Sequence, residues 1–419
     1  MGTERVWDNP EQMIGVDDAL ERILTAFAPL AAVEMPIVDA LGMVVTRDIV
    51  ATVDVPPFRN SAMDGYAVRS ADTAALVTLR VVAMVAAGSV LDRGLAAGEA
   101  IRIMTGAPVP DGADAVVRFE ETDELDRSRT GLLGEIGISR PIQPGENVRE
   151  AGEDVRAGDV VIPAGVQLRP AEVGMLASLN LSTVPVYRRP RVAILSTGDE
   201  VVDLGPQLHP GKIRNSNSYT LAALARQAGG VPILLGVARD TTDDLRAKLR
   251  TTDPPDLFVT SGGVSVGDYD VVKDVLRSEG SIDIWQVRMK PGKPLAFGTI
   301  GGVPLLGLPG NPVAALVSFE QFGRPAIRRM LGHTNLRLPE LEATLTDRLD
   351  NPGRRRHYVR GVIERSSRGL EACPTGSQGS AILIAAVRAN CFIVVPETSD
   401  VVEAGETVRV QVFDGVAMF

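Results

Sequence analysis

The sequence predicts a multidomain α/β and β protein. A discontinuous N-terminal region carries an inserted β-rich domain, a doubly wound α/β domain follows, and a small β domain ends the chain. The 419 residues are enough for about three domains at ~150 residues each. Strand and helix patterns alternate over 190–332, whereas 50–148 and 337–419 hold short β-rich runs between turns. The predicted domain boundaries are 1–49 with 149–188, 50–148, 189–334 and 335–419.

Local sequence patterns predict the elements on either side of the α/β domain. Residues 11–48 are predicted to be helical, because Leu20, Ile23 and Phe27 share one helical face after an acidic first turn. Pro170 predicts the start of a helix over 170–178, since proline is favoured at the first helical position. Near the C-terminus, residues 408–413 alternate as a half-buried strand does.

Within the α/β domain, apolar runs predict the strands and capping residues predict the helices. Asn217 is a candidate cap for a helix that ends before Gly229 and Gly230, and Thr241 or Thr242 for a second helix. Another helix is expected after Pro312. The predicted strands are 191–196, 231–235, 256–260, 283–288, 294–299 and 303–308, and the predicted helices are 217–227, 242–249 and 270–278.

Composition excludes several classes of protein. The net charge of −10 argues against broad nucleic-acid or membrane binding, and no apolar run reaches the ~18 residues of a membrane span. No secretory signal is apparent, and two cysteines exclude a disulfide scaffold, so we expect a cytoplasmic protein. All five lysines lie between 212 and 293, which suggests a local need for ammonium groups, although chance is the alternative.

The loops that follow the predicted strands carry most of the reactive side chains. In an open α/β sheet, ligands bind beyond the carboxyl ends of the strands. Backbone amides there can hold an anion, carboxylates can hold Mg²⁺, and Lys290 and Lys293 add positive charge. The alternative is that these loops are only tight turns. The candidate substrate-binding residues are Thr197, Gly198, Asp199, Asn217, Ser261, Gly262, Gly263, Ser265, Gly267, Pro309, Gly310 and Asn311.

Nucleotide-binding motifs do not explain the glycine-rich loop. Gly262 and Gly267 have P-loop spacing, but Asp268 and Tyr269 stand where Lys and Ser or Thr belong. No G-x-G-x-x-G sequence opens a βα unit, so a dinucleotide fingerprint is absent. The pattern favours a phosphate-bearing substrate with bound magnesium.

Three further segments are ambiguous from their residues alone. The turns at Asp64-Gly65 and Thr105-Gly106 are consistent with purely structural roles. The basic cluster 354–360 with the small residues 377–380 is able to bind an oxyanion, but it also fits a solvated edge strand.

Seven strings in order resemble the molybdopterin molybdenumtransferase family, which is similar to the gephyrin E domain. They are PPFRNSAMDGYAV, RIMTGAPVP, STGDE, SGGVSVGDYD, KPGKP, LPGNPV and GSQGS. The resemblance covers essentially the whole chain. It implies an elongated discontinuous domain, a molybdopterin-binding α/β domain and a C-terminal β-barrel. It also implies a homodimer with active sites shared between subunits.

The resemblance further implies a role in molybdenum cofactor biosynthesis. The expected reaction inserts molybdenum from molybdate into adenylylated molybdopterin, with Mg²⁺-assisted release of AMP. The expected partners are an upstream adenylyltransferase and downstream molybdoenzymes. The implied catalytic residues are Asp64, Thr105, Glu200, Asp240, Asp270, Lys290 and Lys293; the magnesium ligands are Asp240, Asp270 and Glu200; the molybdate ligands are Lys293, Pro294, Arg355 and Ser380.

Two details depart from the family pattern or leave a choice open. Asp268 replaces a glutamate and Val271 a tyrosine in the acidic stretch after Gly267, which leaves the role of Asp268 open. The run Arg354–Arg356 does not say which arginine contacts an oxyanion. The competing functions are the adenylyltransferase itself, which does not account for 1–180 or 337–419, and a scaffold without catalysis.

Overall fold

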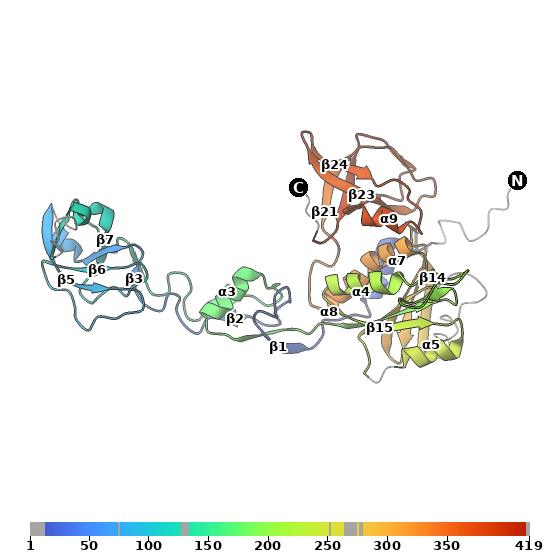
Figure 1. Cartoon of the computed structure of the whole chain (residues 1–419), viewed down its shortest axis with the longest axis horizontal. Helices are drawn as coiled ribbons and strands as arrows, with labels where there is room; N and C mark the ends of the chain where they lie inside the picture. The colour runs from blue at the N-terminus through green and yellow to red at the C-terminus, as the bar shows by residue number, and fades with distance from the viewer. Residues whose placement is uncertain are drawn as a thin grey trace. The chain divides into compact units, whose positions relative to one another are not determined.

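The computed structural model describes residues 13–73, 76–126, 134–250, 253–263, 275 and 280–415. It divides the chain into two compact units (Figure 1). One comprises 1–34, 42–46 and 185–419, and the other comprises 35–41 and 47–184. The four domain boundaries given above stay a prediction, and each unit is described here by itself.

The larger unit contains a six-stranded sheet with a parallel core. In spatial order its strands are β15 (Val231–Ala238), β12 (Arg191–Thr197), β16 (Leu257–Ser261), β20 (Val303–Leu308), β19 (Pro294–Ile300) and β17 (Gly280–Gln286). The first four strands run parallel, and β19 is antiparallel to both of its neighbours. The six predicted strands of this domain are therefore confirmed.

Helices cover both faces of this sheet, because its central strands are apolar on both sides. Val192 and Ile194 of β12 lie in one core with Leu221 of α4 (Asn217–Gln227). Ala193 alternates with them and lies in a second core with Leu245 of α5 (Thr242–Leu249). Figure 1 shows α4 and α5 on opposite sides of β15. The doubly wound prediction is thus confirmed.

The helix predicted after Pro312 forms with an irregular middle. It consists of α7 (Pro312–Ser318), a π-helical turn (Phe319–Gly323) and α8 (Arg324–Met330). Pro325 in the first turn of α8 has no N–H to donate, which favours the break in the regular ladder. The turn buries Glu320, whose carboxylate lies 3.9 Å from Arg324; Arg324 in turn pairs with Asp414 at 2.6 Å.

A closed five-stranded barrel ends the larger unit, as predicted. The pairing runs from β23 through β24, β21, β27 and β25 back to β23, so the ring has no free edge. Strand β18 pairs with β23 in parallel outside this ring. The bounds are β18 (Met289–Lys290), β21 (Glu340–Leu345), β22 (Leu349–Asp350), β23 (Arg356–Ser366), β24 (Gly369–Pro374), α9 (Leu383–Val387), β25 (Cys391–Val395), β26 (Val401–Val402) and β27 (Thr407–Val412).

A five-stranded sheet organises the smaller unit, in agreement with the predicted β-rich insertion. Its order is β7 (Ala115–Arg118), β4 (Gly65–Val68), β6 (Glu99–Ile103), β5 (Val77–Val85) and β8 (Glu135–Ile138). Apolar side chains pack on both of its faces. The same unit holds β2 (Ile49–Val50), β3 (Asn60–Ser61), η3 (Ser70–Thr73), η4 (Phe119–Glu121), β9 (Val148–Arg149), β10 (Val160–Ile162) and α3 (Pro170–Ser178).

Two helix predictions need correction. Within the described part of the predicted 11–48 helix, only Val16–Leu24 (α1) is helical, because Pro29 cannot continue the hydrogen-bond ladder. Residues 32–36 alternate in burial and form strand β1 (Ala32–Pro36) instead. This strand pairs with β11 (Thr183–Tyr187). Asn217 is the first residue of α4 rather than its cap, which is Ser216. The predicted 270–278 helix lies outside the described residues, apart from Val275.

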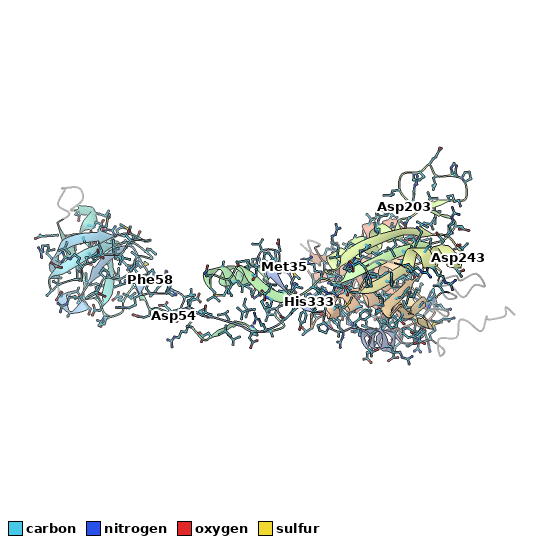
Figure 2. All side chains as sticks on the ribbon, turned by 90° about the horizontal axis from the view of Figure 1, so that it is seen from below. Met35, Asp54, Phe58, Asp203, Asp243 and His333 are labelled. Carbon is cyan, nitrogen blue, oxygen red and sulfur yellow. The ribbon has the colours of Figure 1, made fainter. Side chains whose placement is uncertain are left out.

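Short strands β13 (Val201–Val202) and β14 (Ile213–Arg214) pair beside the main sheet and bound the segment that contains Asp203. Figure 2 shows this segment projecting from the larger unit. Asp203 accepts a hydrogen bond from the Tyr219 hydroxyl at 2.9 Å, which ties the segment to α4. Among the described residues, no helix is long and apolar enough to cross a membrane.

Candidate functional site

A cavity of about 960 Å³ lies at the carboxyl ends of the parallel strands, within the larger unit. The loops after β12 and β16, the starts of α4 and α7, and two loops next to the barrel line it. The predicted residues that line it are Thr197, Gly198, Glu200, Asn217, Asp240, Ser261, Gly262, Gly263, Lys290, Lys293, Pro294, Pro309, Gly310, Asn311, Arg355 and Ser380. The loops expected to converge on one crevice do so.

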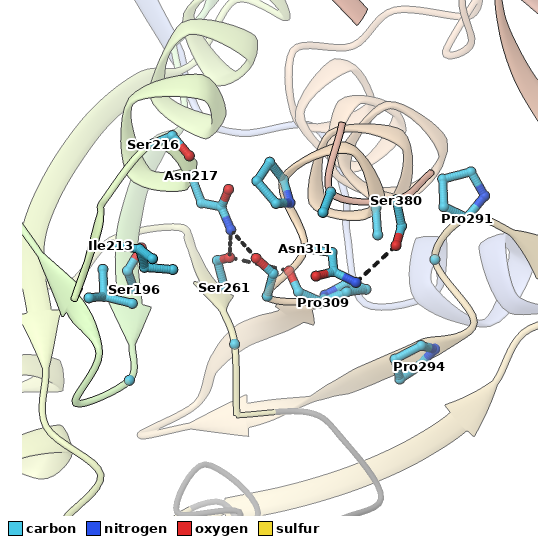
Figure 3. Close-up of a pocket in the computed structure, with 18 of the residues that line it drawn as sticks. Ser196, Ile213, Ser216, Asn217, Ser261, Pro291, Pro294, Pro309, Asn311 and Ser380 are labelled. Carbon is cyan, nitrogen blue, oxygen red and sulfur yellow. Dashed lines mark hydrogen bonds between the residues drawn. The ribbon is translucent and has the colours of Figure 1, made fainter. Parts of the chain in front are cut away.

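Asn217 joins three of these loops, as Figure 3 shows. Its Nδ2 donates to Ser261 Oγ and to the Gly310 carbonyl oxygen, both at 2.7 Å. The Ser261 hydroxyl also donates to the Pro309 carbonyl at 3.3 Å. These bonds fix the floor of the cavity at the ends of β16 and β20. They also explain why Asn217 does not cap its helix, because its side chain bonds to Ser261 and Gly310 instead.

Close packing of backbone restricts the residue type at Gly262. Its φ is +92°, and a Cβ there would lie 2.9 Å from the Thr197 carbonyl oxygen. Only glycine allows both the left-handed conformation and this approach of β12 to the loop after β16. The glycine-rich loop therefore begins as a tight turn at the cavity.

Acidic groups gather where β12 and β15 end. The Asp199 and Asp240 backbone N–H groups each donate to the other residue's carboxylate at 3.3 Å, so the two loops are tied together. The Glu200 side chain folds back over Gly198, so that a Cβ built on Gly198 would lie 2.7 Å from Glu200 Oε2. Glu200 and Asp240 line the cavity, whereas Asp199 does not. The Asp199 carbonyl oxygen accepts from Lys212 at 2.6 Å.

These carboxylates fit a magnesium ion that takes its other ligands from substrate and water. Mg²⁺ typically binds through one or two carboxylates together with substrate phosphates. Glu200 and Asp240 supply two such oxygen donors in one cavity. No group of three His, Cys, Asp or Glu side chains suited to a metal occurs within the described part of the chain. The third predicted ligand, Asp270, lies outside that part, as do Ser265, Gly267 and Asp268.

Positive charge gathers at the barrel side of the same cavity. Lys290 and Arg355 line it, and burial together with Arg355 and Arg360 lowers the pKa of Lys290. Arg360 is fully buried and donates to the Tyr358 carbonyl at 3.0 Å. Among the described residues its guanidinium donates to backbone carbonyls, those of Tyr358 and Gly379, and to no carboxylate, and burial lowers its pKa to about 10. Its charge is therefore available to favour an anion.

Arg360 also holds the loop that carries Ser380. Its backbone N–H donates to Gln378 Oε1 at 2.8 Å, and its carbonyl oxygen accepts from Gln378 Nε2 at 3.1 Å. Ser380 Oγ accepts from Asn311 Nδ2 at 2.9 Å (Figure 3). The sequence placed Arg360 in the basic cluster 354–360 and Gln378 in the segment 377–380, which together are able to bind an oxyanion, but it singled out neither residue. A charged residue inside the apolar run 358–363 was the available signal for Arg360.

The structure distinguishes the three consecutive arginines. Arg354 pairs with Asp400 at 3.1 Å, and Arg356 pairs with Asp17 and Glu397, each at 2.9 Å. Arg355 lines the cavity. The partners of its two neighbours therefore leave Arg355 as the member of the run that faces the cavity.

Asp64 and Thr105 form a separate hydrogen-bonded pair in the smaller unit. Asp64 Oδ1 accepts from the Thr105 backbone N–H at 2.7 Å and from its hydroxyl at 2.8 Å. These bonds, with the nearby charge of Arg102, lower the pKa of the exposed Asp64 carboxyl. The two ambiguous turns of the sequence thus meet, and they present an ionised carboxylate to solvent.

Comparison with known proteins gives the same family across the chain. Three family models match: the MoeA N-terminal region (domain I and II) at 14–180, a probable molybdopterin binding domain at 193–329, and the MoeA C-terminal region (domain IV) at 342–413. The molybdopterin molybdenumtransferase of Haemophilus influenzae is 37% identical over 96% of this chain and 99% of its own length. Molybdopterin molybdenumtransferase 2 of Mycobacterium tuberculosis is 39% identical over 91% of this chain and 95% of its own.

Solved structures agree with the sequence relatives. A molybdopterin biosynthesis MoeA protein from Pyrococcus horikoshii superposes with a TM-score of 0.81 at 33% identity, covering 96% of this chain and all of that one. Near-complete coverage in both directions means that the likeness includes both units and the barrel. From these matches we conclude that the chain belongs to the MoeA family of molybdopterin molybdenumtransferases.

Proposed function

We propose that this chain inserts molybdenum from molybdate into adenylylated molybdopterin, and that Mg²⁺ assists the release of AMP. Its family makes it a transferase of molybdenum cofactor biosynthesis. The adenylylated form of the substrate, the metal and the leaving nucleotide are the parts that we add. The observation that carries the proposal is one cavity lined by carboxylates, by lysine and arginine side chains and by close-packed backbone amides.

The basic side of the cavity suits molybdate. Lys290 and Arg355 supply positive charge, and the buried Arg360, which pairs with no carboxylate of the described residues, adds to the potential. Ser380 and Asn311 place a hydroxyl and an amide at the same wall. Charged and neutral donors together are the usual partners of a tetrahedral oxyanion. We assign molybdate binding to this wall, including the predicted Lys293 and Pro294.

The acidic side suits a phosphoanhydride with its metal. Glu200 and Asp240, together with the predicted Asp270, are the residues that would hold Mg²⁺. When bound, that ion neutralises developing charge on phosphate oxygens. Ser261, Asn217 and the backbone around Gly262 orient the nucleotide portion. Stabilisation of charge at preorganised groups is then the main catalytic effect, which fits a cavity without a nucleophile–histidine pair among its described residues.

We further propose that the protein acts as a cytoplasmic homodimer. In this arrangement the Asp64–Thr105 pair of one subunit completes the active site of its partner. The pair supports the idea because it is exposed, ionised and outside the cavity-bearing unit. An adenylyltransferase supplies the substrate, and molybdoenzymes receive the product. We expect no nucleic-acid or membrane partner.

The direct test follows AMP release from adenylylated molybdopterin with Mg²⁺, with and without molybdate. We expect release that requires both. Nucleotidyl transfer from ATP instead would favour an adenylyltransferase, and tight substrate binding without release would favour a carrier or scaffold.

Mixing the Asp64→Ala and Asp240→Asn variants tests the shared site. Each variant alone should be inactive, and mixed dimers should recover part of the activity. Failure to recover activity, with subunit exchange verified, would place each site within one subunit.

A further inference from the structure

Arg102 lies among the segments that position Asp64 in the smaller unit. It lies on β6 directly opposite Tyr66 of β4, two residues after Asp64. Its Nη1 donates to the Gly65 carbonyl at 3.1 Å and to the Ile103 carbonyl at 3.4 Å. One guanidinium therefore joins the residue that follows Asp64 to the strand end that leads to Thr105.

Two aromatic rings and one carboxylate complete the surroundings of this guanidinium. Its central carbon lies 5.2 Å from the Tyr66 ring centroid and 6.0 Å from that of Phe119. Its Nε donates to Glu124 Oε1 at 3.2 Å, and both side chains of this pair are less than one-fifth exposed. A cation held against aromatic faces away from water binds more strongly than an exposed one.

Phe119 links the Arg102 guanidinium to the Asp64 backbone. The Phe119 backbone N–H donates to the Asp64 carbonyl oxygen at 3.2 Å. Phe119 thus fixes the Asp64 backbone while its ring packs on Arg102. The two Thr105 hydrogen bonds, with the Arg102 charge adding to them, lower the pKa of the Asp64 carboxyl, and burial, with Glu124 and Asp123 adding to it, raises the pKa of the neighbouring Tyr66 hydroxyl.

We propose that Arg102 is a positioning residue that holds the Asp64–Thr105 pair in one geometry for use at the active site. The role in turnover rests on the proposed function, because it assumes that Asp64 acts in the reaction. The contacts need arginine: a lysine ammonium lacks the planar fork that reaches Glu124 and two carbonyls while stacking on rings. The residue acts through Asp64 and does not itself touch the substrate.

The test compares Arg102→Met and Arg102→Lys with the unmodified full-length protein. Methionine keeps apolar contact with both rings, so the module is expected to fold. The first readout is the Asp64 carboxyl titration, followed by NMR with carboxyl-labelled aspartate and assigned with Asp64→Asn. We expect the Asp64 pKa to rise in Arg102→Met and to rise less in Arg102→Lys.

The second readout is AMP release. We expect Arg102→Met to lower kcat by about tenfold or more with KM changed less than about threefold, because the pair is misplaced rather than removed from substrate binding. Arg80→Gln is the matched control, since Arg80 pairs with Glu99 at 2.6 Å in the same sheet but contacts neither ring. It should leave both readouts unchanged.

The two readouts separate the possible failures. An unaltered Asp64 titration in a folded Arg102→Met protein would overturn the positioning role whatever the turnover does. If the unmodified protein releases no AMP, the proposed function fails, and the titration still decides the role of Arg102. A rise in the Asp64 pKa with unchanged kcat would overturn the link between this geometry and catalysis.

Discussion

Replacing Asn217 with alanine should weaken nucleotide binding while the protein stays folded. The change removes two hydrogen bonds, to Ser261 Oγ and to the Gly310 carbonyl oxygen, each 2.7 Å long. A typical intramolecular hydrogen bond contributes about 0.5–1.5 kcal/mol net, so the pair is worth about 1–3 kcal/mol. We expect the lower half of this range, because the cavity admits water to the orphaned carbonyl and Ser261 keeps its bond to Pro309.

These bonds order the cavity floor before AMP binds, so their loss reaches Kd as far as AMP has to order the same loops, and about 1.4 kcal/mol sets an upper limit of a tenfold rise in Kd. Calorimetric titration with AMP and Mg²⁺ measures it directly. Tyr219→Phe is the matched control, since it also removes one hydrogen bond from α4, the 2.9 Å bond to Asp203, but lies outside the cavity lining. The reasoning is refuted if folded Asn217→Ala binds AMP within twofold of the unmodified protein, or if Tyr219→Phe weakens binding equally.

Three other outcomes follow from the same structure. Arg355→Gln should raise the molybdate concentration needed for AMP release, whereas Arg354→Gln, whose guanidinium already pairs with Asp400, should not; equal titrations would contradict the assignment. Asp240→Asn should abolish release at every Mg²⁺ concentration that saturates the unmodified protein, and release with an unshifted Mg²⁺ titration would remove Asp240 from the metal site. Burial raises the pKa of the Glu320 carboxyl from 4.5 to about 7. Between these two pH values the folded protein binds this proton and the unfolded chain has lost it. The free energy of unfolding should therefore fall as pH rises from 4.5 to 7, by about 3 kcal/mol. Glu320→Gln should abolish that loss in thermal unfolding between pH 5 and 8, and parallel curves for the two proteins would contradict it.

Local patterns predicted the regular elements well. Helices 170–178, 217–227 and 242–249 form where capping, proline and glycine signals predicted them, because those signals act within a few residues. The 11–48 helix was wrong beyond Leu24, since a helical face was extended past Pro29. Asn217 shows the limit of capping rules: the side chain that fits a cap is used for tertiary contacts instead.

Long-range pairing explains what the sequence could not predict in the site. The three consecutive arginines are equivalent until Asp17, Glu397 and Asp400 are placed beside them, and Asp17 lies more than 300 residues away. Arg360 was not singled out from the basic cluster 354–360, because its burial and its backbone carbonyl partner appear only in the fold. The meeting of Asp64 with Thr105 likewise depends on the pairing of β4 with β6.

The most direct measurement of the central claim is AMP release from adenylylated molybdopterin by the full-length protein, with Mg²⁺ held constant and molybdate varied. We expect release that rises with molybdate to saturation and is lost with Asp240→Asn. Release that proceeds at the same rate without molybdate would contradict the coupling of metal insertion to nucleotide cleavage in this cavity.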